Sequence, residues 1–352
     1  MSWFNFAHSG GANWRECVER CADRLGRAGG GLGFVYFSDA LVGEAREIVD
    51  VLRSRSGVQD WVGTVGTGVI ATGTEYQDEP AIAAMIMEFS SNEYQVFSGR
   101  APLRKEPAHF AVVHADPQAP DVPGLVADMA AKVASGYVVG GISSSRGATV
   151  QIANEVVSGG LSGVALAPQV AVATRLTQGC SPFGPRRRIT ACEENVIAEL
   201  DGQPALEVLL GAADEKLIRT GRILVGLPVA GSDTGDYVVR NLVGIDPRAK
   251  LVAIGEAVEI GDEIVFCRRD AAAAREDLAG MLQKLKAAAP RPRGALYFSC
   301  VARGEHMFGS RGAELGLVRQ ALGELPLVGF FCNGEICHDR LYGYTGVLTL
   351  FH

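Results

Sequence analysis

The pattern of apolar and polar positions near the start of the chain returns near its end. An apolar run over residues 33–39 stops at small polar residues, and so does the run over residues 294–300. Each run leads into a stretch with helical spacing. A second apolar run then ends in a glycine-rich turn, over residues 61–68 and 327–334. This order predicts a strand–helix–strand unit that occurs twice.

The two units keep the same register through their second strand and its turn. Gly63 aligns with Gly329, and Gly68 aligns with Gly334. Turns that follow equivalent strands lie at equivalent places in the two copies. We therefore expect them to form facing half-sites, a geometry that favours a small molecule over a large partner.

A weaker third copy lies between these two units. Its strand covers residues 110–114, and its second strand and turn cover residues 137–145. The later segment 160–166 is similar to 343–349, which extends the match by one strand. Shared residues at fixed offsets indicate a common architecture, although they do not establish a common function.

The remaining pattern predicts an opening helix, a central strand-rich region and a late helix. Trp14, Cys17, Val18, Cys21 and Leu25 recur at helical spacing and form one buried face. Further predictions are a strand over 81–89, a turn-rich loop over 179–185, a hairpin of 188–190 with 195–200, strands over 223–229, 237–245, 250–254 and 263–267, and a helix through Leu278 and Leu285. We expect an α/β or α+β protein, internally duplicated, with two pseudo-symmetric halves and helix-covered sheets.

Composition and charge narrow the class of protein. The chain has 352 residues, of which 47% are hydrophobic and 21% charged, so a large core can form. The net charge is −7 and no basic stripe occurs, which argues against a nucleic-acid partner. The cluster Arg186-Arg187-Arg188 is either an anion patch or a solvated loop.

The chain carries no pattern that directs it to a membrane or to export. Residues 1–21 lack an uninterrupted apolar segment of the signal-peptide kind, and no stretch has the length of a membrane span. We therefore expect a cytoplasmic protein, without a membrane partner, whose eight cysteines are reduced thiols.

Several of these segments together resemble the FIST family, in its FIST N and FIST C parts. In the first part, the matching segments are 34–38, 62–68, 140–145, 179–184 and 189–206. In the second part, they are 297–304 and 328–336. The resemblance implies a leader and helix over 1–29, a FIST N domain over 30–220 and a FIST C domain over 221–352.

The resemblance also implies a function. FIST proteins are regarded as sensors of small ligands, with amino acids as the usual candidates. We expect a free-standing sensory protein, without an output domain, that binds a small polar ligand and signals through a separate partner. On this basis it is a binding protein rather than an enzyme.

Arg303 and Glu335 are the candidates for the ligand's charged ends. Each lies just beyond the carboxyl end of a predicted strand, so their loops line one crevice if the strands are neighbours. Arginine holds a carboxylate through two parallel hydrogen bonds, and glutamate can hold an ammonium group. An α-amino acid would satisfy both residues, whereas the alternative is a salt bridge between them without a ligand.

The expected ligand site gathers the strand-end residues of the repeats. Ser299, Asn333 and backbone amides of the turns would add hydrogen bonds to the ligand. The full set is Gly66, Thr67, Ser143, Ser144, Ser299, Cys300, Arg303, Gly304, Cys332, Asn333, Gly334 and Glu335.

Two alternative chemistries remain open. Cys300 and Cys332 lie at equivalent strand ends and, with His306 or His338 as the base, would suit a cysteine-dependent hydrolase. Some FIST-like proteins bind haem, for which His114, His306 or His338 would be the axial ligand. We expect no cofactor, with haem as the alternative.

The sequence argues against metal and nucleotide sites. Cys332, Cys337 and His338 lack the spacing of a zinc site and a fourth ligand, so we expect no bound metal. The glycine-rich turns do not match the dinucleotide-binding or P-loop patterns.

Overall fold

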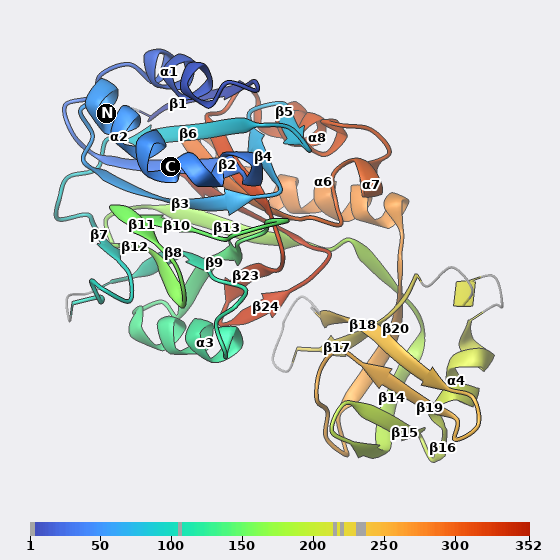
Figure 1. Cartoon of the computed structure of the whole chain (residues 1–352). Coiled ribbons are helices and arrows are strands. Elements are labelled where there is room, and N and C mark those ends of the chain that lie inside the picture. The colour runs from blue at the N-terminus through green and yellow to red at the C-terminus, as the bar shows by residue number, and fades with distance from the viewer. Residues whose placement is uncertain (1–3, 105–107, 214–216, 219–221, 230–236) are drawn as a thin grey trace. The chain divides into compact units, whose positions relative to one another are not determined.

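A computed structural model describes residues 4–104, 108–213, 217–218, 222–229 and 237–352 (Figure 1). The chain forms two compact units. Unit 1 comprises residues 1–177 and 275–352, and unit 2 comprises residues 178–274. Unit 2 is therefore inserted into unit 1, since both ends of the chain belong to unit 1.

Unit 1 contains three sheets with one plan, each of six strands within the described residues. In each sheet two adjacent strands are parallel, two antiparallel strands lie on one side of them, and a hairpin lies on the other. Sheet I has the order β1 (Phe4–Gly10), β6 (Ala81–Met87), β2 (Leu32–Ser38), β3 (Asp60–Gly66), β10 (Gln151–Ala153) and β11 (Glu155–Val157).

The other two sheets repeat this order. Sheet II consists of β7 (Tyr94–Phe97), β12 (Leu161–Leu166), β8 (Phe110–Ala115), β9 (Tyr137–Ile142), β23 (Glu335–His338) and β24 (Arg340–Tyr342). Sheet III consists of β13 (Val172–Thr177), β25 (Gly346–Phe351), β21 (Gly294–Cys300), β22 (Leu327–Cys332), β4 (Gly68–Ala71) and β5 (Thr74–Gln77). The repeat predicted from the sequence is confirmed, and the weak third copy is a complete sheet.

The hairpins are exchanged between the repeats in a closed cycle. Hairpin β4–β5 follows β3 of sheet I but pairs with β22 of sheet III. Hairpin β23–β24 follows β22 but pairs with β9 of sheet II, and hairpin β10–β11 follows β9 but pairs with β3 of sheet I. Each strand-end turn therefore crosses from one sheet to the next.

One glycine in each repeat permits the close approach of the two parallel strands. A Cβ atom on Gly63 would lie 1.7 Å from the carbonyl oxygen of Val35. On Gly140 it would lie 1.8 Å from that of Val113, and on Gly329 it would lie 1.7 Å from that of Tyr297. Only glycine fits at these positions, which explains the glycine register of the sequence.

Helices cover the outer faces of the sheets, and the inner faces pack against one another. In Figure 1, α1 (Trp14–Leu25) and α2 (Ala45–Ser56) lie against sheet I, and α3 (Val122–Lys132) lies against sheet II. The short helix η1 (Asp39–Glu44) precedes α2. In the third repeat, α6 (Ala271–Ala288) precedes β21, and α7 (Glu305–Phe308) and α8 (Ala313–Leu322) connect β21 to β22. The buried face predicted for the opening helix is confirmed.

Aromatic rings from all three sheets meet where the inner faces join. The rings belong to the residue that follows Val35, Val113 or Tyr297, the residue that the close-approach glycine of each repeat contacts. These residues are Tyr36, His114 and Phe298, and their ring centroids lie 5.6 to 6.4 Å apart. Phe330 stacks on Tyr36 at 5.2 Å. This cluster forms the centre of unit 1 and fixes the three sheets around one point.

Unit 2 is a closed antiparallel barrel. Its strands are β14 (Cys180–Glu193), β20 (Glu263–Arg269), β17 (Ile223–Pro228), β18 (Tyr237–Asp246), β19 (Leu251–Ile254) and β15 (Val196–Leu200), with β16 (Gln203–Pro204) beside β15. Because β14 pairs with both β20 and β15, the ring closes. Helix α4 (Ala205–Ala212) contributes to the core of the barrel.

The barrel interrupts the third repeat between its first strand, β13, and its first parallel strand, β21. The loop predicted over 179–185 is wrong, because residues from Cys180 onward belong to β14. The pairing of β14 with β20 is irregular between Phe183 and Arg187, where the sequence has Gly184-Pro185. The predicted hairpin of 188–190 with 195–200 is confirmed by the pairing of β14 with β15. The division of the chain predicted at 220–221 stays a prediction.

Candidate functional site

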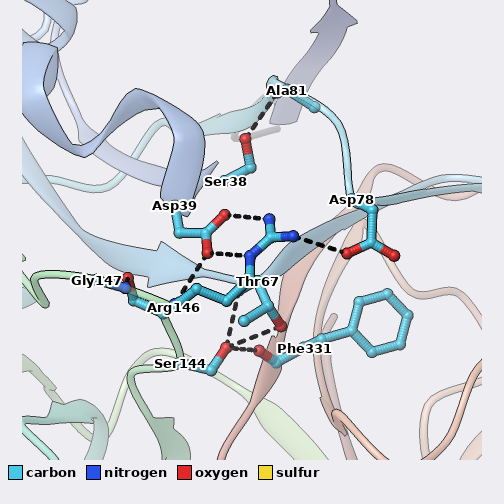
Figure 2. A network of polar contacts seen from close by, with 10 residues as sticks. Ser38, Asp39, Thr67, Asp78, Ala81, Ser144, Arg146, Gly147 and Phe331 are labelled. Atoms are coloured by element: carbon cyan, nitrogen blue, oxygen red, sulfur yellow. Dashed lines mark hydrogen bonds and ion pairs between the residues drawn. The ribbon is translucent and has the colours of Figure 1, made fainter.

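The strand-end turns that the sequence predicts as half-sites lie together in unit 1. In each repeat, the turn contains the residue three positions after the close-approach glycine Gly63, Gly140 or Gly329. These equivalent residues are Gly66, Ser143 and Cys332. The amide of Thr67 donates to Ser144 Oγ at 2.9 Å, and Ser144 Oγ donates to the carbonyl oxygen of Phe331 at 2.5 Å (Figure 2). One serine thus links the turns of all three repeats.

Further hydrogen bonds join the second and third turns. The amide of Asn333 donates to the carbonyl oxygen of Ile142 at 3.0 Å, and the amide of Ile142 donates to that of Gly334 at 2.9 Å. Ser143 Oγ lies 2.6 Å from Thr64 Oγ1 and donates to the carbonyl oxygen of Ala115 at 3.0 Å. The turns form a continuous polar network in which the serine hydroxyls already bind protein groups.

Arg303 is fully buried and pairs with Glu314 of α8 rather than with Glu335. Its Nε lies 2.8 Å and its Nη2 2.6 Å from Glu314 Oε1. Glu314 also accepts hydrogen bonds from the Tyr297 hydroxyl at 2.5 Å, from Ser299 Oγ at 3.2 Å and from the Gly304 amide at 3.3 Å. Such a buried ion pair persists only when its remaining hydrogen-bonding positions are filled.

The aromatic ring of Phe308 covers Arg303. The guanidinium carbon lies 5.1 Å from the centre of the Phe308 ring, which belongs to α7. Arg275 of α6 lies over the same ring at 5.4 Å and donates to the carbonyl oxygen of Phe308. Arg303 Nη1 has a longer contact, 3.4 Å, with the carbonyl oxygen of Tyr344. Access to Arg303 therefore depends on the position of α7.

Glu335 is fully buried at the start of β23, and its hydrogen bonds come from uncharged groups. Oε2 accepts from the Thr345 hydroxyl at 2.6 Å and from the Thr345 amide at 3.1 Å. Oε1 accepts from Cys332 Sγ at 3.1 Å. Burial raises the pKa of Glu335 to about 7, although these bonds and the charge of Arg303 lower it. Glu335 therefore binds its proton much more tightly than an ordinary glutamate side chain does.

A further buried carboxyl group lies near the Arg303–Glu314 pair. Glu75 of β5 is 7% exposed, and neither of its carboxyl oxygens has a hydrogen bond that meets ordinary geometry within the described residues. Burial raises its pKa to about 7, and the charge of Glu314 raises it further, whereas the amides of Gly312 and Leu315 at the start of α8 lower it. Two buried carboxyl groups, those of Glu75 and Glu314, thus influence each other's charge.

The two strand-end cysteines are buried thiols in register with each other. Burial raises the pKa of Cys300 to about 12 and holds that of Cys332 well above its usual range, and the charge of Glu335 raises both further. Thiols of this kind form little thiolate at neutral pH. Cys332 donates to Glu335 and to the carbonyl oxygen of Ser299. The hydrolase alternative stays a prediction without support from this geometry.

The candidate histidines lie at three separate places. His114 belongs to the central aromatic cluster, where its Nε2 lies 3.2 Å from the Tyr36 hydroxyl and burial lowers its pKa to about 3. His306 is exposed in α7, and His338 pairs with Asp339 at the surface. Coordination of haem by His114 Nε2 would break its bond to Tyr36. In the part of the chain that the structure describes, no group of three metal-binding side chains occurs.

The first repeat carries a different polar group at its strand end. Arg146 follows the serine turn and binds Asp39 through Nε at 2.8 Å, Nη2 at 2.7 Å and its amide at 3.0 Å (Figure 2). Its Nη1 donates to Asp78 at 3.0 Å. The hydrogen bonds from Arg146 lower the pKa of Asp39. This ion pair joins the first and second repeats at the surface.

Sequence reasoning missed Glu314, Glu75, Asp39 and Arg146 as members of these sites. One signal was present for Glu314, which precedes Leu315 and shares the apolar stripe of α8 with Val318. A charged residue on a buried helix face needs a partner. Arg146 directly follows the serine turn, and Asp39 directly follows the first strand.

Comparison with known families gives two matches that follow one another along the chain. Residues 31–203 match the FIST N domain, and residues 204–338 match the FIST C domain. The chain belongs to the FIST family. FIST domains are associated with sensing and signal transduction.

Relatives of this FIST protein occur in mycobacteria. The uncharacterized protein MT0656 of Mycobacterium tuberculosis is 32% identical over 320 residues, which cover 82% of this chain and 83% of the relative. The uncharacterized protein Mb0898c of Mycobacterium bovis is 28% identical over 364 residues, covering 96% and 94%. The similarity thus extends over both FIST parts. None of the helices that the structure describes is long and apolar enough to cross a bilayer.

Proposed function

We propose that this FIST protein is a sensor that reversibly binds a small polar ligand, with an amino acid as the first candidate, at the strand-end turns of its third repeat. The buried carboxyl group of Glu335 carries the proposal. It lies where the turns meet, and its hydrogen bonds come from uncharged donors. Without a ligand, Glu335 binds a proton near neutral pH, because its pKa is raised. The ammonium group of a ligand would take the place of this proton and pair with the carboxylate.

Arg303 is the natural partner for the carboxylate end of such a ligand. Its Nη1 has only a long contact with Tyr344, whereas Nε and Nη2 bind Glu314. A ligand carboxylate would therefore bind through Nη1 or compete with Glu314 for the guanidinium group. Asn333 and the turn at Gly334 would supply further hydrogen bonds. Ser299 Oγ and the Gly304 amide would donate to the ligand only by leaving Glu314.

Ligand entry requires α7 to move, because Phe308 covers the guanidinium group of Arg303. Arg275 holds Phe308 from the first turns of α6, the helix that leads from the barrel strand β20 into unit 1. A ligand that favours the displaced position of α7 would shift the population toward it. The change would reach α6, and a separate signalling partner would read it.

A thermal-shift screen against amino acids and related acids tests this proposal. A ligand present at ~100 times its Kd adds about 2.7 kcal/mol to the stability of the folded state, which raises the melting temperature measurably. Glu335→Gln keeps the shape of the side chain and removes its charge, so it should abolish the shift. Glu324→Gln is a matched control, because Glu324 is 76% exposed and pairs only with Arg319 among the described residues.

The screen has three possible results. A hit that is lost in Glu335→Gln and kept in Glu324→Gln supports the site. A hit that both variants keep places the ligand elsewhere. A screen without any hit removes the amino-acid proposal.

A further inference from the structure

Two grooves occupy equivalent places in unit 1, and they differ in size and chemistry. In each, the helix between the two parallel strands faces the tip of the hairpin donated by another repeat. In sheet I, α2 faces hairpin β10–β11, and Arg53 donates to the carbonyl oxygen of Asn154 at its tip. In sheet III, α8 faces hairpin β4–β5, and Arg319 lies beside Gly73 at its tip. Arg53 and Arg319 are thus counterparts.

The groove of sheet III is closed by aliphatic side chains. Leu315, Val318 and Leu322 of α8 meet Leu325 and Leu327 below them. The remaining cavity is about 10 Å³. The fold therefore allows this position to be filled with an apolar core.

The groove of sheet I is open and lined by charged side chains. Its cavity is about 340 Å³, a size found in small-ligand sites. Three arginines line it from two parts of the chain: Arg46 and Arg53 from α2, and Arg100 from the segment after β7. Because the equivalent groove closes with leucines, neither the opening nor the arginines are required by the fold.

The charges in the open groove are not balanced. Asp50 lies 4.0 Å from Arg53, and Glu155 lies 3.7 Å from Arg100. Arg46 has no hydrogen bond or ion pair to another described residue. The groove therefore holds one more positive than negative side chain, in a protein whose net charge is −7.

Arg53 is the fixed member of the three. Its Nε donates to the carbonyl oxygen of Gln59 at 2.9 Å, and another nitrogen donates to that of Asn154. Its side chain is 26% exposed, and Nη1 faces the groove beside Asp50. A guanidinium group held in this way is prepared to bind an oxyanion without further loss of side-chain freedom.

We propose that the groove between α2 and hairpin β10–β11 binds a small multivalent oxyanion, carrying phosphate or carboxylate groups, through Arg46, Arg53 and Arg100. Arginine matches both groups through paired hydrogen bonds. The site is separate from the strand-end turns of the third repeat and does not depend on the amino-acid proposal.

Calorimetric titration of the full chain with inorganic phosphate, pyrophosphate and citrate at constant ionic strength tests the proposal. Binding of any of these with a defined stoichiometry supports it, and the order of affinities distinguishes a phosphate site from a carboxylate site. The double variant Arg46→Ala/Arg100→Ala should weaken binding by roughly tenfold or more, as expected for lost hydrogen bonds between charged groups. Arg55→Ala is the control, because Arg55 on the same helix pairs with Asp23 and Glu19 outside the groove.

A gain of affinity separates recognition from a loss of folding. Asp50→Asn/Glu155→Gln removes both acidic side chains from the groove and leaves the arginines, so binding of the same anion should become tighter by roughly threefold to tenfold. The proposal is overturned if none of the three anions binds in the millimolar range. It is also overturned if neither double variant changes the affinity.

Discussion

The strand ends of the first and third repeats have the same backbone plan, but their ion pairs differ in burial. In the first repeat, Asp39, whose side chain is 6% exposed, pairs with Arg146, whose side chain is 58% exposed. In the third, Arg303 pairs with Glu314 where both side chains are at most 1% exposed. The repeat thus fixes where a polar group lies. Whether that group joins neighbours at the surface or forms a buried site depends on what covers it.

The largest loss of stability is expected when the buried Arg303–Glu314 pair is broken. Glu314→Ala leaves Arg303 buried without a counter-ion and also removes the partner of Tyr297 and Ser299. Breaking a buried pair in this way costs about 3–5 kcal/mol of unfolding free energy. Urea denaturation of the full chain measures the change. A loss below about 1 kcal/mol would mean that solvent reaches Arg303.

The pH dependence of stability should also distinguish the two regions. The pKa of Glu335 rises from 4.5 to about 7 on folding, so the folded state binds its proton more tightly than the unfolded state. This stabilisation is complete below pH 4.5 and is lost as the pH rises through about 7, with a slope of at most about 1.4 kcal/mol per pH unit. Glu75 acts in the same direction.

Glu335→Gln should therefore flatten the stability curve between about pH 5 and pH 8. Chemical denaturation at several pH values measures this slope. Asp39 contributes to the pH dependence with the opposite sign, because its pKa is lowered and its stabilising contribution is lost as the pH falls into the acid range. Asp39→Asn should therefore reduce the loss of stability at acid pH. Equal slopes in the wild type and in Glu335→Gln would show that this carboxyl group does not titrate as described.

The glycines test whether the repeats are equivalent at all. Gly63→Ala, Gly140→Ala and Gly329→Ala each place a Cβ atom less than 2 Å from a carbonyl oxygen, so each should cost about 1–3 kcal/mol or more. Gly280→Ala in α6 meets no atom within 4 Å and should be neutral or slightly stabilising. Thermal denaturation of the four variants makes the comparison. A tolerated change at one of the three glycines would break the equivalence.

The smallest loss of stability is expected at the Asp39–Arg146 pair, in which only the arginine is exposed. Asp39→Ala removes the partner of Arg146, whose side chain is 58% exposed, so the loss of unfolding free energy should be smaller than at the fully buried pair. The measurement is denaturation at low and high salt, and the difference between wild type and variant should shrink as the salt rises. A loss as large as that of Glu314→Ala would remove the contrast between the repeats.

The sequence predicts the repeat because its causes are local. Gly63, Gly140 and Gly329 stand at the same strand position, and the apolar face of α1 follows helical spacing. The exchange of hairpins could not be predicted in this way, because the pairing of Glu335 with Gly141 joins residues far apart in the chain. The partner of Arg303 was missed for the same reason. Of two acidic candidates, only the folded chain shows that Glu314 is the one within hydrogen-bond distance.

The turns were predicted better than the charges. Thr67 and Ser144 are brought together as expected, since turns that follow equivalent strands must converge. Cys180 to Pro185 was assigned to a loop on the strength of glycine and proline, but its first four residues, Cys180 to Phe183, pair with β20. Tertiary pairing thus outweighed local turn preference.

The central claim is that an ammonium group replaces the proton of Glu335, and calorimetry in two buffers of different ionisation enthalpy tests it most directly. With an amino acid that the screen identifies, binding to the wild type at pH 7 should release roughly half a proton, because the pKa of Glu335 is about 7. Glu335→Gln should lose both the affinity and the proton release. Unchanged affinity in Glu335→Gln, or binding without proton release in the wild type, would contradict the claim.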